Sequence, residues 1–268
     1  MTFPTRIHEK VAGLFAGFCR NRRSIDTVLV VNSCARGVAT PQSDLDMAAL
    51  VKADTPDMEI SELGASWERF ASRNARVAEF MNMGPYCKLH IDFFTGTFTP
   101  SLWDEGGGPD SFEIEIGNRI AHSAVWGSMG SHFEELRQQW LPFYGNQLRT
   151  ERIEMVRKAC AYHLEYIKLL HGRRLYFHAF DKLYTAYQEF LQGVFIARQT
   201  YPIAYNKWIH EQIVEWLELP DLYDELLTVL TITDLEGDDI LSKADLLHEL
   251  LENWVKPITA LADLQPPQ

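Results

Sequence analysis

The chain has 268 residues, of which 46% are hydrophobic and 23% are charged, so its composition is that of an ordinary globular protein. Its formal net charge is −12, with 37 acidic residues against 25 basic ones. A surface this negative repels a phosphate backbone, so we expect no extended nucleic acid as a partner. It would suit a small cationic substrate, although solubility alone explains most of the charge.

Membrane and disulfide-rich classes are also disfavoured. No apolar run approaches the ~18 residues that a membrane-spanning helix needs, and the first ten residues lack the pattern of a signal peptide. We therefore expect a cytoplasmic protein with no membrane partner. The four cysteines form no Cys-x-x-Cys pair, which argues against a zinc ribbon or a disulfide framework.

The first third of the chain alternates helical and strand patterns. Apolar residues at helical spacing predict a helix within 3–20, and the β-branched run at 27–31 predicts a buried strand. A polar turn of about a dozen residues then leads to a second predicted strand at 45–51. Residues 58–81 have a helical pattern, which Gly84-Pro85 ends.

The pattern continues with a third strand predicted at 88–94. Residues 95–111 have no periodicity and predict a loop, and its three consecutive glycines lack the Gly-Lys-Ser/Thr ending of a phosphate-binding P-loop. A short strand at 124–126 and a helix from about Ser131 to Trp140 close this half.

The second half is helical in pattern from Glu151 onward. Ser242 and Asp245 predict a capping box for a last helix that extends to Trp254. Strands followed by helices indicate an α+β fold. We predict a mixed sheet-and-helix domain over 1–145 and a helical domain over 146–268.

Two acids mark the candidate site. Asp44 and Asp46 lie at the start of the second predicted strand, where alternation puts both side chains on the same side. Close carboxylates repel each other, and a hard divalent cation such as Mg²⁺ relieves this because it takes oxygen ligands. An exposed edge strand that happens to carry two acids is the alternative for this pair alone.

The turn before these acids is rich in small residues. Ser33 lies eleven residues before Asp44, at the end of the first predicted strand, and Cys34, Ala35 and Gly37 follow it closely. Small side chains let backbone N–H groups approach an anion. Arg36 could add a charge-assisted contact to such an anion, or it could lock the turn by pairing with an acid of the fold.

The third predicted strand supplies another acid. His90 and Asp92 alternate with apolar residues and therefore share a face. If this strand lies beside the second, Asp92 joins Asp44 and Asp46, and three such acids can hold two metal ions about 3.5–4 Å apart. We give His90 a structural role, as a neighbour that could orient Asp92.

The run VVNSCARGVATPQSDLDMAAL, from Val30 to Leu50, resembles the motif of the DNA polymerase β-type nucleotidyltransferase superfamily. That motif is a strand ending in Gly-Ser or Gly-Gly, a short loop, and Asp-x-Asp on the next strand. The match is close over about twenty residues and is similar to bacterial aminoglycoside and lincosamide nucleotidyltransferases, whose helical C-terminal domains resemble the second half in layout.

The resemblance implies specific roles. Ser33 would bind nucleotide phosphate, Asp44 and Asp46 would ligate metal, and Asp92 would be the third ligand and the general base. The cofactors would be two Mg²⁺ ions, with ATP or another nucleoside triphosphate as co-substrate. The reaction would transfer a nucleoside monophosphate, commonly AMP, to a hydroxyl of a small molecule such as an aminoglycoside-like antibiotic. Relatives that bind substrate between two subunits make a homodimer an expected possibility.

Two positions complicate this reading. Asn32 stands where the family usually has glycine; it readily accepts a left-handed backbone, but its side chain could crowd or bond to a phosphate. Lys207, between aromatic residues, could reach across an interdomain cleft to the triphosphate, or it could be a surface lysine whose stem covers apolar neighbours.

Two alternatives therefore stay open. One is a nucleotidyltransferase that modifies a protein partner, as in toxin–antitoxin systems. The other is a degenerate relative that binds nucleotide without turnover, which Asn32 favours.

Overall fold

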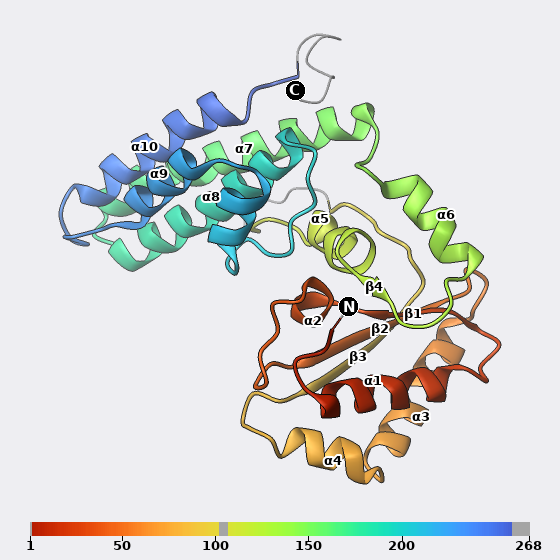
Figure 1. Cartoon of the computed structure of the whole chain (residues 1–268). Helices are drawn as coiled ribbons and strands as arrows, with labels where there is room; N and C mark the ends of the chain where they lie inside the picture. Colours follow the sequence, from red (N-terminus) through yellow and green to blue (C-terminus); the bar gives the residue numbers. More distant parts are fainter. Residues whose placement is uncertain (1, 102–106, 259–268) are drawn as a thin grey trace. The chain divides into compact units, whose positions relative to one another are not determined.

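The computed structural model describes residues 2–101 and 107–258, which divide into two compact units (Figure 1). The first unit comprises Met1–Thr99 and Glu115–Leu141, and the second comprises Pro100–Ile114 and Pro142–Gln268. The predicted boundary after residue 145 lies close to the last of these divisions. The segment Pro100–Ile114, which we assigned to the first domain, belongs to the second unit.

The first unit is built on a four-stranded sheet. Its strands are β1 (Ile25–Val30), β2 (Leu45–Val51), β3 (Leu89–Phe94) and β4 (Ala124–Val125), in the order β3-β2-β1-β4. β1 is antiparallel to both β2 and β4, whereas β2 and β3 run parallel. The predicted strands therefore form one mixed sheet.

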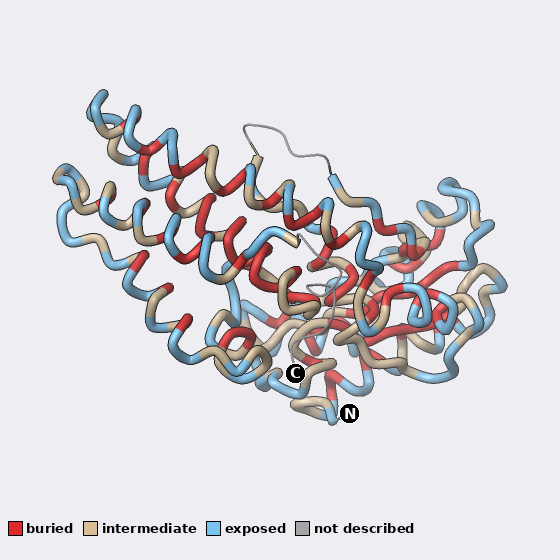
Figure 2. The backbone as a smooth tube through the Cα atoms, turned by 90° about the horizontal axis from the view of Figure 1, so that it is seen from above, coloured by how far each residue is buried: buried red, intermediate tan, exposed pale blue. Residues whose placement is uncertain are grey.

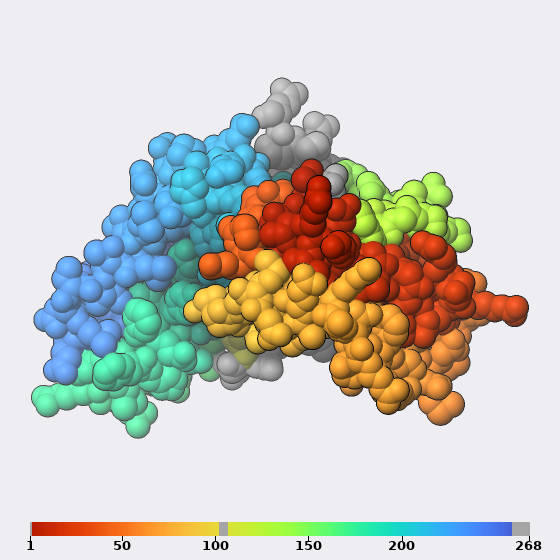
Figure 3. Space-filling view, turned by 60° about the horizontal axis from the view of Figure 1, so that its bottom comes forward, coloured from red at the N-terminus to blue at the C-terminus, as the bar shows by residue number. Residues whose placement is uncertain are grey.

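Three helices cover one face of this sheet: α1 (Arg6–Cys19), α3 (Asp57–Ala71) and α4 (Ala75–Met81). Figure 3 shows the outer side of this layer, with α1 in red and α4 in orange-yellow. Their apolar residues pack against alternate strand residues, which include Val28, Val30 and Met47. The helical pattern predicted over 58–81 is confirmed, and it forms two helices, because α4 begins after Asn74, whose side chain accepts from Arg76 N and caps this helix.

On the other face, α6 (Ser131–Trp140) packs near β1. Asp26, on β1, accepts hydrogen bonds from His132 N at 3.2 Å and Phe133 N at 3.1 Å, which satisfies amides in the first turn of α6. A side chain at Gly130 would lie 2.2 Å from the Asp26 carboxylate, so glycine is needed there. This contact fixes where α6 begins.

The second unit consists of helices. They are α7 (Asn146–Gly172), α8 (Tyr176–Ala197), the π-helical segment η2 (Glu211–Trp216), α9 (Pro220–Leu230) and α10 (Asp239–Trp254). Buried positions, red in Figure 2, recur every three or four residues along the long helix α7, as its apolar pattern predicts. The capping box predicted at Ser242 is wrong, because α10 begins at Asp239, one turn earlier.

A buried ion network explains why Pro100–Ile114 belongs to this unit. Arg152, on α7, donates to Glu113 Oε2 at 2.7 Å and to Asp110 Oδ1 at 2.5 Å. Burial alone would lower the pKa of Arg152, but its hydrogen bonds to Glu113 and Asp110 outweigh burial and raise it. Gln192 and Tyr144 complete the network, since each donates to Glu113 at 2.8 Å.

Three short helical segments lie where the sequence predicted no helix. They are α2 (Asn32–Arg36), α5 (Phe112–Ile116) and the π-helical segment η1 (Gly117–Ala121). The helices and the mixed sheet agree with the α+β class at the level of mixed secondary structure. The polymerase β-like layout stays a prediction. Within the described residues, no helix combines the length and the apolar character needed to cross a membrane.

Candidate functional site

The strand register places two of the predicted acids on one face of the sheet. In the parallel pair, Asp46 lies opposite His90, and Ala48 lies opposite Asp92. Strand residues alternate between faces, and Leu45 and Met47 point into the core beneath the helices. Asp46 and Asp92 therefore lie on the opposite face, on neighbouring strands.

Asp44 immediately precedes β2 and lies near the same face. Its Oδ2 is 3.7 Å from His90 Nε2, and both side chains are accessible, with exposed fractions of 42% for Asp44 and 61% for His90. The amide of Leu45 donates to Lys88 O at 2.9 Å, which joins the beginnings of β2 and β3. The His90 imidazole therefore lies near the carboxylate of Asp44, whereas the sequence predicts it as a neighbour of Asp92.

The turn after β1 contains the short helix α2, which begins at Asn32. Asn32 has a φ of 56°, in the left-handed region that asparagine tolerates better than most residues other than glycine. Val31 N donates to Asp46 O at 3.1 Å, and Cys34 Sγ donates to Asp44 O at 3.6 Å. These bonds hold the turn beside both acids.

Ser33 and Arg36 lie within this anchored turn, and both are partly buried. Ser33 O accepts from Val38 N at 3.1 Å, and Gly37, at φ 78°, ends the helix with a left-handed residue. The turn is therefore a closed local unit. Its position beside Asp46 agrees with the predicted arrangement, while the phosphate-binding roles of Ser33, Asn32 and Arg36 stay predictions.

Cys34 reports the electrostatic character of the turn. Burial, together with smaller contributions from the negative charges of Asp46 and Asp44, raises the pKa of its thiol to about 11. At neutral pH the raised pKa favours the thiol over the thiolate, which is the form that attacks substrates or binds metals.

Arg119, on η1, is a site residue that the sequence did not reveal. Its Nη2 donates to Asp92 Oδ2 at 2.5 Å, and its Nη1 lies 3.5 Å from Glu115 Oε2. Its guanidinium also lies 5.1 Å from the ring centroid of Phe94. The pair is accessible, with exposed fractions of 29% for Arg119 and 49% for Asp92. Asp92 is therefore held by a cation of the protein itself.

The residues can be tested for their fit to Mg²⁺. Asp44 and Asp46 provide the hard oxygen ligands that this ion prefers, and both are partly exposed. Asp92 Oδ2 is bonded to Arg119, so this oxygen would have to exchange Arg119 for a metal ion. Among residues 2–101 and 107–258, no three His, Cys, Asp or Glu side chains are gathered as a group that could hold a metal ion. Asp44 and Asp46 would be the ligands at the start of β2, and their role toward Mg²⁺ stays a prediction.

Lys207 lies in the second unit, whereas the acids lie in the first. Its side chain is exposed, and its carbonyl accepts from Gln212 Nε2 at 2.9 Å, which fixes the backbone before η2. The role of Lys207 toward a triphosphate stays a prediction.

No model of a protein family matches the chain, and no curated protein matches it significantly.

Proposed function

We propose that the chain is a Mg²⁺-dependent nucleotidyltransferase. It would transfer a nucleoside monophosphate, AMP from ATP, to a hydroxyl of a small molecule such as an aminoglycoside-like antibiotic. The observation that carries this proposal is the register of β2 and β3, which puts Asp46 and Asp92 on one face beside the turn that contains Ser33. The sequence resemblance supplies the reaction class.

The chain's own residues would divide the work. Asp44 and Asp46 would hold Mg²⁺, which when bound supplies positive charge to offset that of the triphosphate. The small residues of the Ser33 turn would let backbone amides approach phosphate oxygens. Asp92 would accept the proton of the acceptor hydroxyl, which requires that it exchange Arg119 for substrate.

A second candidate function is nucleotide binding without turnover. The ion pair between Asp92 and Arg119 favours it specifically, since the Oδ2 atom of Asp92 is already occupied by a guanidinium group. Under this alternative Arg119 is a fixed part of the site, and Asp92 does not take part in proton transfer.

Calorimetry with ATP tests the site common to both candidates. We expect binding that requires Mg²⁺ and that Asp46→Asn abolishes. Asp54→Asn is the matched control, because Asp54 is an exposed acid in the loop after β2 and its loss should leave binding unchanged. Binding that is independent of Mg²⁺, or unaffected by Asp46→Asn, would contradict the proposal.

Release of pyrophosphate separates the two candidates. Aminoglycosides and lincosamides are screened as acceptors in the presence of ATP and Mg²⁺, and a product carrying AMP is sought by mass spectrometry. Turnover that Asp92→Asn abolishes while ATP still binds supports the transferase. ATP binding with no turnover on any acceptor, including whole-cell extract, supports the binding protein.

A further inference from the structure

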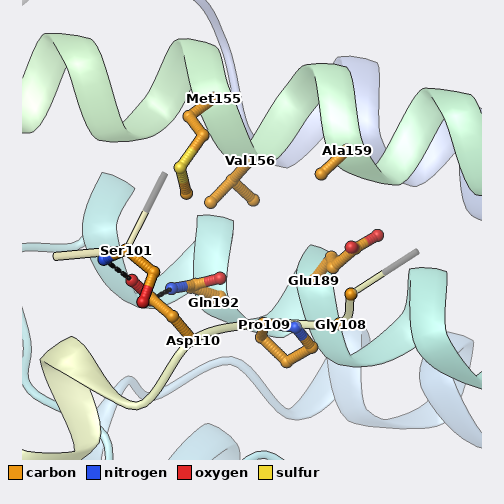
Figure 4. Close-up of a pocket in the computed structure, with 10 residues that line it drawn as sticks. Ser101, Gly108, Pro109, Asp110, Met155, Val156, Ala159, Glu189 and Gln192 are labelled. Atoms are coloured by element: carbon orange, nitrogen blue, oxygen red, sulfur yellow. Dashed lines mark hydrogen bonds between the residues drawn. The ribbon is translucent and has the colours of Figure 1, made fainter. Parts of the chain in front are cut away.

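The second unit contains a cavity that the proposed function does not use. It has a volume of about 220 Å³, smaller than the roughly 300–1,000 Å³ of sites that hold drug-sized ligands (Figure 4). One wall is apolar and comes from α7, through Met155, Val156 and Ala159. Across from it lie Glu189 and Gln192, on α8. A ligand for this cavity would be small and amphipathic.

The segment before α5 forms another part of the wall. Gly108, Pro109 and Asp110 line the cavity, together with Ser101. The only ionisable side chains among the described lining residues are the two carboxyl groups, those of Asp110 and Glu189. The two carboxyl groups differ in how many hydrogen bonds their oxygens accept.

Asp110 is fully occupied. Its Oδ1 accepts from Gln192 Nε2 at 2.7 Å and from Arg152 Nη2 at 2.5 Å. Its Oδ2 accepts from Ser101 N at 2.8 Å and from Arg152 Nη1 at 3.0 Å. Arg152 also bonds to Glu113, so one cation faces two carboxylates and the network has an excess of negative charge.

Glu189 is not fully occupied. Its side chain is only 1% exposed, and a hydrogen bond of 2.9 Å joins its Oε2 to His163 Nδ1. Its other oxygen, Oε1, is buried and accepts no hydrogen bond from any residue that the structure describes. In Figure 4 the carboxylate lies between α8 and Ala159 of α7. A buried carboxylate oxygen without a donor is costly, so a partner that supplies one would bind favourably.

We propose that this cavity binds a small aliphatic amine in its ammonium form, whose N–H group donates to Glu189 Oε1. The ammonium group matches the carboxyl groups of the wall and the absence of Lys and Arg among the described lining residues. The side chains of α7 would contact its hydrocarbon part. The proposal does not depend on nucleotidyl transfer, and all residues that carry it belong to the second unit.

Titration of the full-length chain with n-butylammonium chloride tests the chemical class. We expect saturable binding in the millimolar range, with 1-butanol, a neutral molecule of similar shape, binding at least about tenfold more weakly because it lacks the charge. Equal affinity for the two, or no saturable binding of the amine, would overturn the proposal.

Glu189→Gln tests the residue. Glutamine keeps the volume and can still bond to His163, but it removes the charge, so the affinity for n-butylammonium should fall at least about tenfold. Glu165→Gln, an exposed replacement on α7, is the matched control and should bind like the natural chain. Asp46→Asn should also bind normally, which separates this cavity from the acids of the sheet. Unchanged affinity in Glu189→Gln contradicts the proposal.

A location measurement serves if Glu189→Gln does not fold. The chain has 7 methionines, of which Met155 lines the cavity. In a spectrum of ¹³C-methyl-methionine, n-butylammonium should shift the Met155 signal, assigned with Met155→Leu, and leave that of Met47 in place. Saturable binding that leaves the Met155 signal unmoved would place the ligand elsewhere and sink the idea.

Discussion

Asp92 and Glu189 are carboxylates with one side-chain partner each among the interactions described above, yet their surroundings give them different properties. Asp92 is 49% exposed and its bond to Arg119 is open to water, so solvent screens the pair. Glu189 is 1% exposed, and its bond to His163 is shielded. The first acid is free to exchange its partner at little cost, whereas the second strongly favours whatever satisfies its remaining oxygen.

Removal of Arg119 should therefore strengthen cation binding at the sheet. Arg119 and a divalent cation compete for Asp92 if that acid is a ligand. An exposed ion pair contributes up to ~1 kcal/mol, so Arg119→Gln should raise the affinity for Mn²⁺ or Mg²⁺ by up to about fivefold. Calorimetry with MnCl₂ measures this. Arg137→Gln, at an exposed position of α6, should show no gain. An unchanged affinity in Arg119→Gln would mean that Asp92 is not a ligand.

Glu189 should make stability depend on pH. Burial raises the pKa of its carboxyl, and the His163 bond, which lowers it, only partly offsets this effect. A raised pKa means that the folded chain holds the proton more tightly than the unfolded chain. This contribution is complete below the unfolded pKa of about 4.3 and is lost as the pH rises through the folded value, with a slope of at most ~1.4 kcal/mol per pH unit.

Urea unfolding at a series of pH values measures this effect. The free energy of unfolding of the natural chain, relative to that of Glu189→Gln, should fall as the pH rises above about 4.3. Relative to Glu165→Gln, it should stay flat. A difference that instead grows with pH would show that the pKa of Glu189 is lowered in the folded chain.

Among the helices, the C-terminus of α7 carries avoidable strain. Arg174 follows the helix with a φ of 58°, and Leu175 N donates to Leu170 O at 2.9 Å, which is the closure usually made with glycine. Arg173, next to it, has an ordinary φ of −94°. Of these two arginines, only Arg174 adopts a left-handed conformation, whose strain glycine would relieve.

Glycine should thus have opposite effects at the two positions. In the left-handed region an L-residue costs ~1–2 kcal/mol, and the added freedom of glycine in the unfolded chain costs ~0.4–1 kcal/mol. Arg174→Gly should therefore stabilise the chain by about 0.5–1 kcal/mol, and Arg173→Gly should destabilise it. Thermal unfolding of both variants checks this. A loss of stability in both would contradict the explanation.

The elements that the sequence predicted well are those with a clear period. Short apolar runs bounded by polar turns located β2 and β3 to within one residue. The sequence did not predict helix boundaries that hydrophobic spacing leaves unmarked. The side chain of Asn74 caps α4 and divides the region 58–81, and α10 begins at Asp239, before Ser242. Neither boundary changes the hydrophobic spacing from which the helices were predicted.

The site was predictable only in part for a similar reason. Asp44, Asp46 and Asp92 follow from strand period, and β3 does lie beside β2. Arg119 comes from a π-helical segment with no sequence pattern of its own, so its pairing with Asp92 could not be foreseen. Glu113 resembled a solvated charge in the sequence, and only the fold brings Arg152 to it.

For the molecule as a whole, the division into two compact units predicts that the stability of each unit can be measured separately. Each unit buries its own apolar residues, and the network around Arg152 ties the segment Pro100–Ile114 to the helices of the second unit. The second unit therefore contains a segment, Pro100–Ile114, that lies between two parts of the first unit in the sequence. A change in this network should affect the second unit first.

Arg152→Met should destabilise the second unit selectively. It would leave Asp110 and Glu113 buried without their cation, and the loss of one partner of a buried pair costs about 3–5 kcal/mol. Amide hydrogen exchange should become faster in α8 and stay unchanged in β2, which measures the two units separately. Asp110→Asn and Glu113→Gln, added to Arg152→Met, remove the unpaired charges and should restore part of the protection in α8. Equal acceleration in β2 would show instead that the two units unfold together.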